Sequence, residues 1–193
     1  MNIRIEQAAE TKRKIVEAAV DILSVNGPQA LTSGKLSAKL GMSKGTLFHH
    51  FEDMEGVQLA VLDYIIALLD EVQERNHKTL QALVNDLIDT SFASIEQYRS
   101  VYAALFYFIC SSLHNPAFQE RLRERMNRTM AAWKQTLFKY VNREVSVTKQ
   151  DRIVRMLDMF FSGLCIHDFI YTDPKRYKRI TKDFMALLVD HLE

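Results

Sequence analysis

A cluster of side chains suited to contact a nucleic acid lies between Ser43 and His50, in the run Ser-Lys-Gly-Thr-Leu-Phe-His-His. Ser43 is suited to cap a helix, because its hydroxyl oxygen accepts hydrogen bonds from N–H groups of the first turn. Lys44, Gly45 and Thr46 then place a positive charge, an open backbone and a hydroxyl in that turn. The free N–H groups and dipole of such a turn favour phosphate, and its side chains are suited to base edges in a DNA groove.

A second short helix must precede this cluster and hold it in place. The pattern predicts a helix over about 33–40 capped by Thr32, a turn at Gly41, and a helix from Ser43 through His50. Glycine suits the turn because it adopts a positive φ without steric cost. The two helices form a predicted helix-turn-helix. The side chains expected to pack inward are all apolar: Leu36, Leu40, Met42, Leu47 and Phe51.

The outward residues of this predicted helix-turn-helix divide into two roles. Base edges are assigned to Lys44, Thr46 and His49, whose polar groups lie on the outer side. Phosphate contacts are assigned chiefly to hydroxyls, to the backbone of Phe48 and to His50. The full predicted DNA-binding set is Thr32, Ser33, Ser43, Lys44, Gly45, Thr46, Phe48, His49 and His50.

The run from Gly41 to Phe51, GMSKGTLFHHF, resembles the recognition-helix signature of the TetR family of bacterial regulators, G-V-S-x-G-x-L-Y-x-H-F. The likeness extends upstream to Asn26-Gly27 and covers about the first quarter of the chain. The resemblance implies a dimer that presents two recognition helices to successive major grooves of a palindromic operator.

Three positions depart from the family pattern. Phe48 stands where the family usually has tyrosine, Met54 where it usually has a phosphate-binding lysine, and Val57 where it usually has leucine. The first two changes remove donors to phosphate. The family's contacts to the DNA backbone therefore do not carry over to this helix-turn-helix unchanged, whereas its fold does.

Charge is balanced over the whole chain and uneven within it. The formal net charge is only +1, but residues 1–50 carry seven Lys or Arg and four Asp or Glu, an excess of three positive charges. Lys12, Arg13 and Lys14 fall in the first turns of a predicted helix over 8–25. Two interpretations stay open for them: a solvated charged face, or phosphate contacts beside the groove.

The rest of the chain predicts an all-α fold. Six glycines and three prolines interrupt 193 residues only rarely, and no strand-like alternation stands out. Asp53 is expected to cap the fourth helix, Thr148 with Asp151 the eighth, and Asp173 precedes the ninth. The nine predicted helices are 8–25, 33–40, 43–50, 53 to about 74 or 77, 79–97, 99–113, 116–142, 148–171 and the segment from 174.

These helices are grouped into an N-terminal head and a larger C-terminal domain. Residues 1–53 are the predicted DNA-binding domain, with the start of the fourth helix packed on it. Residues 54–77 are the connecting helix. Residues 78–193 are the predicted effector-binding and dimerisation domain.

The helix predicted over 148–171 is apolar on nearly every side, so it must be buried on all sides. In a small domain this indicates contact between subunits. With the last helix, two copies would form a four-helix interface by two-fold symmetry. The predicted interface residues are Leu157, Phe160, Phe161, Leu164, Phe184 and Leu188.

Aromatic and sulfur-containing side chains are frequent in the C-terminal domain, where core packing is the default role of each. Together they suit a cavity for a small, mostly apolar effector. A quaternary ammonium held by aromatic rings is an alternative that the sequence does not separate from a lipid or a drug. The predicted ligand-binding residues are Phe92, Tyr102, Phe106, Cys110, Trp133 and Met159.

Other kinds of site are not expected. His49 and His50 point about a hundred degrees apart on a helix and do not converge on a metal ion. Cys165, His167 and Asp168 are too closely spaced on one helix to face one another as nucleophile and base. We therefore predict no metal, no cofactor and no catalysis. Cys110 and Cys165 are expected to be buried free thiols.

The apolar run over 101–113 is too short to span a membrane, and the N-terminus has no secretory signal, which favours a cytoplasmic protein. Taken together, the residues predict a homodimeric transcriptional repressor that a small molecule releases from a palindromic operator. The alternative is a DNA-bound interaction protein whose C-terminal domain binds a protein partner and no small ligand.

Overall fold

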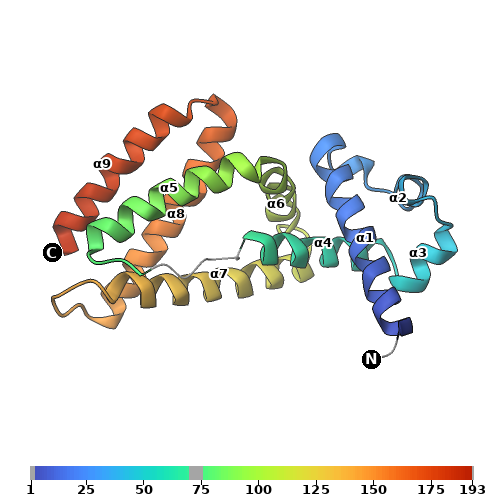
Figure 1. Ribbon diagram of the computed structural model, residues 1–193, viewed down its shortest axis with the longest axis horizontal. Helices are drawn as coiled ribbons and strands as arrows, with labels where there is room; N and C mark the ends of the chain where they lie inside the picture. Colours follow the sequence, from blue (N-terminus) through green and yellow to red (C-terminus); the bar gives the residue numbers. More distant parts are fainter. Residues whose placement is uncertain (1–2, 70–75, 193) are drawn as a thin grey trace. The chain divides into compact units, whose positions relative to one another are not determined.

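A computed structural model of the chain describes residues 3–69 and 76–192 (Figure 1). Over these two ranges it contains nine α-helices, one short 3-10 helix and no strand, which confirms the all-α prediction. Contacts divide the chain into two compact units. The first consists of Met1–Glu71 with Tyr98–Glu124, and the second of Val72–Gln97 with Arg125–Glu193.

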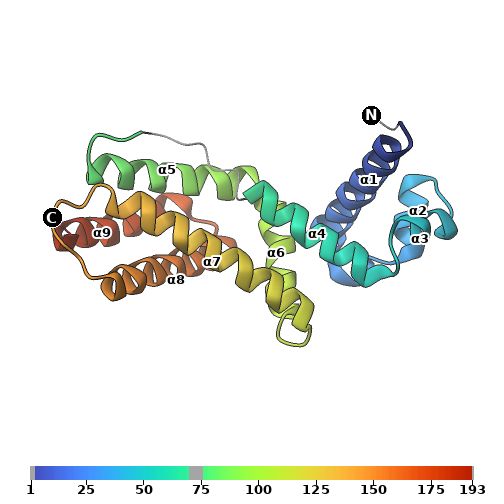
Figure 2. The same cartoon turned by 90° about the horizontal axis from the view of Figure 1, so that it is seen from below.

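The first unit is organised around α1 (Ile3–Asn26), which contacts α2, α3, α4 and α6. Figure 2 shows α2 and α3 beside α1 at one end of this unit. The other elements of the unit are η1 (Pro28–Ala30), α2 (Ser33–Leu40), α3 (Lys44–His50), α4 (Met54–Leu69), α6 (Arg99–Ser111) and the first part of α7 (Pro116–Phe138).

One apolar core joins the helices of this unit. Each large aliphatic or aromatic side chain removed from water contributes about 1.5–3 kcal/mol to folding. Leu47 on α3 has no exposed surface, so burial anchors even this seven-residue helix. The side chains of this core with no exposed surface include Ile15, Leu36, Leu47, Leu62, Ile65 and Phe108.

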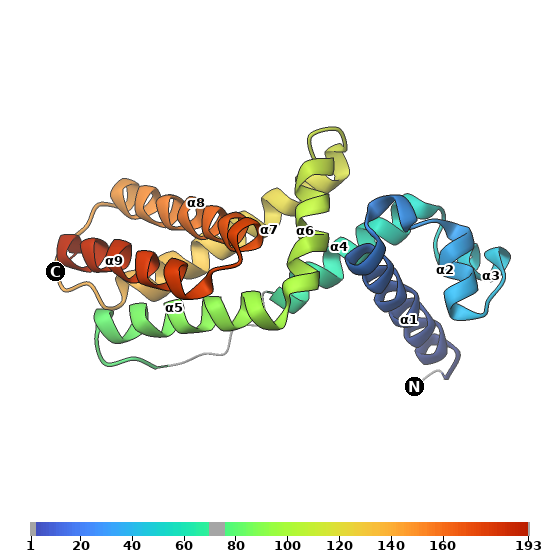
Figure 3. The same cartoon turned by 90° about the horizontal axis from the view of Figure 1, so that it is seen from above.

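The second unit packs α5 (Leu80–Gln97) and α8 (Val147–Tyr171) against α9 (Pro174–Leu192). Figure 3 shows α5 and α9 side by side. The later part of α7 is joined to α8 by Lys134, which donates to Asp151 Oδ1 at 2.8 Å. The core side chains of this unit include Leu83, Ile88, Ile153, Leu164, Met185 and Leu192.

Several helix ends differ from the sequence prediction. α1 begins five residues earlier than expected, α6 ends at Ser111, and α7 ends at Phe138. The predicted end of the fourth helix near 74 lies outside the described residues. The alternative end at His77 is wrong: His77 is not helical, and its backbone N–H donates to the Tyr140 hydroxyl at 3.1 Å.

The predicted cap of α8 is also wrong. The helix begins one residue earlier than expected, with Ser146 at the cap position and no hydrogen bond from its side chain. Thr148 therefore lies inside the first turn. Asp151 accepts from Lys134 of α7 instead of completing a capping box. The carboxylate that the local pattern assigned to the start of the helix thus pairs with a lysine of another helix.

The contact-defined units divide the chain differently from the predicted domains. α6 and the first turns of α7 join the first unit, because α6 packs on α1 and α4. The assignment of roles to residues 1–53, 54–77 and 78–193 remains a prediction. In the part of the chain that the structure describes, no helix is long and apolar enough to cross a membrane.

Candidate nucleic-acid interface

The turn between α2 and α3 depends on Gly41. Its φ of 64° lies in the left-handed region, and its backbone N–H donates to Ala38 O at 3.3 Å. The next N–H, of Met42, donates to Ser37 O at 3.0 Å. A Cβ at Gly41 would meet nothing within 4 Å, so backbone conformation and not space requires glycine here.

Both helices of the motif are capped as predicted. Thr32 Oγ1 accepts from the Lys35 N–H at 3.2 Å at the start of α2. Ser43 Oγ accepts from the Thr46 N–H at 3.0 Å at the start of α3. The two hydroxyls of Ser43 and Thr46 lie 2.9 Å apart and share a further hydrogen bond. The Thr46 hydroxyl is therefore held in place before any ligand arrives.

The face of α3 opposite Leu47 is open to solvent. Phe48 is 39% exposed although it is aromatic. Most of the predicted DNA-binding residues lie at this surface: Thr32, Ser43, Lys44, Gly45, Thr46, Phe48 and His49 are exposed, and Ser33 and His50 are half-buried. Of the predicted inward residues, Leu36 and Leu47 are fully buried, and Leu40, Met42 and Phe51 are partly buried and packed on the core.

Lys44 lies across the first turn of α2 in this structure. A Cβ built on Gly34 would come 3.8 Å from its Cε and 4.0 Å from its Nζ. These are ordinary van der Waals distances, so Gly34 is not required for space. Lys44 itself is exposed, so its ammonium group is accessible at the surface of the motif.

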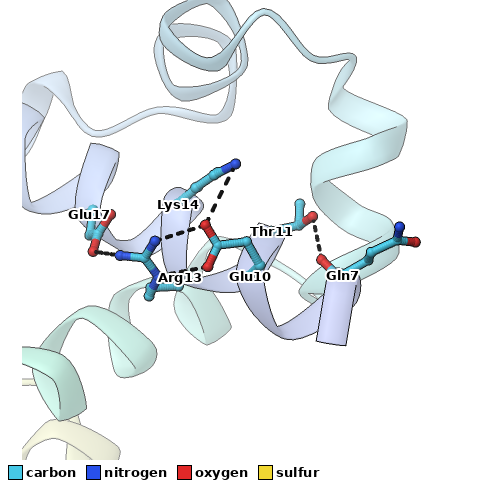
Figure 4. Close-up of polar contacts among 6 residues, drawn as sticks. All are labelled: Gln7, Glu10, Thr11, Arg13, Lys14 and Glu17. Atoms are coloured by element: carbon cyan, nitrogen blue, oxygen red, sulfur yellow. Dashed lines mark hydrogen bonds and ion pairs between the residues drawn. The ribbon is translucent and has the colours of Figure 1, made fainter. Parts of the chain in front are cut away.

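The charged residues on α1 are largely paired with one another (Figure 4). Arg13 donates to Glu10 at 2.8 and 2.9 Å and to Glu17 at 2.6 Å. The hydrogen bond from Arg13 lowers the pKa of Glu10, and that same bond raises the pKa of the guanidinium. Lys14 lies 3.6 Å from Glu10, and Lys12 lies over the Phe51 ring at 5.6 Å. Phosphate contact by Arg13 therefore competes with its hydrogen bonds to Glu10 and Glu17.

His49 and His50 interact with each other and not around a common centre. Their ring centroids lie 5.5 Å apart with planes at 74°. Within the described ranges, no group of three His, Cys, Asp or Glu residues is arranged to hold a metal ion. His49 is exposed and His50 is half-buried, so both rings reach the surface of α3.

The six predicted ligand-binding residues are distributed over both units. Tyr102, Phe106 and Cys110 lie on α6 in the first unit, and Phe92, Trp133 and Met159 in the second. Phe92 is buried in the core of its unit, whereas Met159 is 67% exposed and Cys110 is exposed as well. Trp133 packs edge-on against Phe161 with centroids 5.7 Å apart. The expectation of a buried Cys110 is wrong.

Two surface hollows in the second unit are formed by other residues. One is lined by four cations of α9, Lys175, Lys178, Arg179 and Lys182. The other is apolar, lies between α8 and α9, and contains three of the predicted interface residues. Its lining is Ile153, Met156, Leu157, Phe184, Leu187, Leu188 and His191.

The predicted interface residues differ in how much surface they offer. Leu157 and Leu164 are only 3% and 5% exposed, because they belong to the core of their own unit. Phe160, Phe161, Phe184 and Leu188 are half-buried, and Phe160 stacks on Phe184 with centroids 4.0 Å apart. The sequence analysis did not assign their more exposed neighbours to the interface, and these are Met156, Met159, Ile166, Ile170, Ile180 and Leu187.

Cys165, His167 and Asp168 do not form a reactive group. Burial raises the pKa of the Cys165 thiol to about 11, so the thiolate that acts as a nucleophile is scarce at neutral pH. His167 stacks on Tyr171, and its Nδ1 lies 3.5 Å from the Tyr177 hydroxyl. Asp168 is buried with 3% exposure.

The capped α3, with Leu47 buried and its polar face exposed, is the recognition helix of a helix-turn-helix transcription regulator. Residues 15–61 match the family model described as bacterial regulatory proteins, tetR family. This N-terminal segment is therefore similar to the DNA-binding domain of TetR-family regulators, and the chain is a DNA-binding transcriptional regulator.

Relatives of known role agree with this family. The chain is 24% identical over 110 residues to the transcriptional regulator BetI of Escherichia coli, a match spanning 54% of this chain and 56% of BetI. It is 22% identical over 190 residues to the transcriptional regulator CymR of Pseudomonas putida, covering 94% and 91% of the two chains. A transcriptional regulator from Saccharomonospora viridis, solved in complex with choline, has the same fold with a TM-score of 0.71, 19% identity, and coverage of 92% and 96%.

Proposed function

We propose that this regulator is a homodimeric repressor whose affinity for a palindromic operator falls when a small molecule binds its C-terminal domain. The observation that carries the proposal is the α3 surface, where a fixed Thr46 hydroxyl, Lys44 and His49 are exposed beside a capped helix start. These groups match what a major groove requires. The hydroxyls of Thr32, Ser33 and Ser43, the Phe48 backbone and His50 then hold phosphate.

Exposed apolar surface on α8 and α9 supports the dimer. Met159 and Leu187 are 67% and 69% exposed in one chain, and an apolar hollow lies between the two helices. Apolar surface concentrated on two helices marks an interaction site. Under two-fold symmetry, the half-buried Phe160, Phe184 and Leu188 and their exposed neighbours meet the same residues of a second copy.

The choline complex of the Saccharomonospora viridis regulator supports a small-molecule effector. We assign the effector to the C-terminal domain and keep six residues as separate candidate contacts, with Tyr102 and Trp133 first, followed by Phe92, Phe106, Cys110 and Met159. The effector acts by preferring one conformation of the dimer, and its effect on DNA affinity equals that preference. No observation favours the alternative of a protein partner. Such a regulator needs no catalytic group and works in the cytoplasm, where the DNA is.

The test begins with selection of bound duplexes from random-sequence DNA by the full chain. The selected duplex should be palindromic, with half-sites about 10 base pairs apart. Thr46→Ala combined with His49→Ala should weaken binding to this duplex by at least tenfold, because each base contact contributes about 1–3 kcal/mol. Unchanged affinity of the double variant would overturn the assignment of α3. A monomer by sedimentation at micromolar concentration would overturn the dimer.

A thermal-shift screen of small molecules then tests the effector. A ligand that binds only the folded state raises the midpoint of unfolding. The effector should also release the selected duplex. A screen in which stabilising compounds leave DNA affinity unchanged would contradict ligand-controlled repression.

A further inference from the structure

The side chain of Asn115 connects two helices. It lies immediately before α7, and its Oδ1 accepts from the N–H groups of Ala117 at 2.9 Å and Phe118 at 3.2 Å. This is the cap of α7. Its Nδ2 donates to Glu55 Oε1 in the first turn of α4, at 2.9 Å. One amide thus fixes the start of α7 and the start of α4 at the same time.

Glu55 lies close to the recognition helix along the chain. α3 ends with the Phe51 N–H donating to Leu47 O at 3.2 Å, and Asp53 Oδ1 then accepts from the Gly56 N–H at 2.8 Å to cap α4. Only a short, hydrogen-bonded connection separates α3 from Glu55. Because such a connection has few free torsions, the orientation of the first turn of α4 limits the orientation of α3.

Two further contacts hold the first turns of α7 in the first unit. Phe118 is 2% exposed and packs edge-on against Phe108, with ring centroids 5.2 Å apart. Arg121 lies 3.6 Å from Asp63 of α4, but both side chains are about half exposed, and such pairs are screened by solvent. Glu55 is exposed as well, so the Asn115–Glu55 hydrogen bond also lies at the surface, but at 2.9 Å it is shorter and more directional than the Arg121–Asp63 pair.

We propose that Asn115 is a positioning residue for DNA binding: through Glu55 it holds the first turn of α4, and thereby α3, in the orientation that meets the operator. The inference rests on the proposed function and adds a residue outside the head that sets the head's orientation. A preoriented α3 loses less conformational freedom when it enters the groove. The link lies at the start of α7, a helix whose residues belong partly to the first unit and partly to the second.

Asn115→Asp breaks the link and keeps the cap. A carboxylate caps a helix as well as an amide does, but it has no N–H to donate and it repels Glu55. The Kd for a duplex selected with the wild-type protein should rise by about three- to tenfold, the factor that one hydrogen bond is worth. Backbone N–H groups of residues 44–50 should also exchange faster with solvent deuterium in the absence of DNA, while the midpoint of thermal unfolding stays close to that of the wild type.

A second substitution, Glu55→Gln, should restore the hydrogen bond that Asn115→Asp removes. The new amide can donate to the new carboxylate, which restores the bond with its polarity reversed. Affinity and exchange should both return toward the wild-type values. Asn127→Asp, at an exposed position on the same helix, makes the same change in charge away from the link and should alter neither.

Unchanged or tighter DNA binding by Asn115→Asp would overturn the proposal, and so would a loss that Glu55→Gln fails to restore. The exchange measurement needs no DNA. If the wild-type protein selects no duplex, the proposed function fails. Separately, the link is overturned if residues 44–50 of Asn115→Asp exchange as slowly as they do in the wild type.

Discussion

The exposed surfaces of α3 and of the α8–α9 pair are opposite in character. α3 buries one leucine and exposes lysine, threonine and histidine, whereas α8 and α9 expose methionine, isoleucine and leucine around an apolar hollow. The first surface suits a charged, hydrated partner, and the second suits another apolar surface. The difference supports the proposal that one chain carries two kinds of recognition, one for DNA and one for a second copy of itself.

The largest expected effect comes from the apolar surface of α8 and α9. If this surface binds no second copy, the contrast with α3 has no functional meaning. Met159→Glu with Leu187→Glu places two charges on side chains that are 67% and 69% exposed, so the fold of the single chain should survive. The dimer should dissociate, and affinity for the selected duplex should fall by about a hundredfold, because two linked half-site contacts become one. Sedimentation and a DNA-binding titration measure the two effects. Leu113→Glu, at a 78% exposed leucine of the first unit, is the control and should remain dimeric.

A second test concerns the interior of the second unit. Burial raises the pKa of Cys165 to about 11, above the usual thiol value, so the folded state holds the thiol proton more tightly than the unfolded state. Between about pH 9 and pH 11 the unfolded chain releases this proton first, so stability falls as pH rises through that window, by about 2 kcal/mol at its upper end.

Cys165→Ser removes this titration. Denaturant unfolding of the variant should show less loss of stability from pH 8 to pH 11 than the wild type does. Parallel pH profiles for the two proteins would show that Cys165 titrates as an ordinary, solvated thiol.

The head can be tested at its turn. Gly41→Ala places a Cβ on a residue with φ of 64°, which costs about 1–2 kcal/mol because the left-handed region is strained for L residues. Gly56→Ala, inside α4, meets only Asp53 Oδ1 at 3.6 Å and should stabilise the helix by up to about 1 kcal/mol. Chemical denaturation measures both. Effects of the same sign would mean that the turn does not depend on Gly41.

The last test, with the smallest expected effect, distinguishes the capping role of Ser43 from a contact with DNA. Ser43→Ala removes the acceptor of the Thr46 N–H and should destabilise the protein by about 1 kcal/mol. Ser43→Asp keeps an acceptor and should retain stability, but its charge faces phosphate and should weaken DNA binding. If both variants bind the selected duplex like the wild type, Ser43 is a structural cap alone.

The two surfaces also differ in how far the sequence predicts them. The caps at Thr32, Ser43 and Asp53 and the turn at Gly41 were predicted correctly, because each depends on residues within a few positions. The inward side of α8 was not resolved, since a helix that is apolar all round gives no sign of which side meets its own core. Leu157 and Leu164 are buried in their own unit, whereas Met156 and Met159 are exposed.

Long-range polar pairs are the second kind of feature that the sequence does not predict. Asn115 and Glu55 are sixty positions apart, and no local pattern links them. The same limit explains the wrong cap at Thr148, where Lys134 of another helix took the carboxylate of Asp151. Local hydrogen bonds can be read from spacing, but hydrogen bonds between helices require the fold.

The unequal burial of the two thiols has a practical consequence. Cys110 is exposed on α6, whereas Cys165 is half-buried and its raised pKa keeps it protonated at neutral pH. A maleimide fluorophore should therefore attach to Cys110 in the native protein without prior mutation. Because α6 packs on α1 and α4, the dye's emission would report rearrangement of these helices in real time as DNA or effector is added.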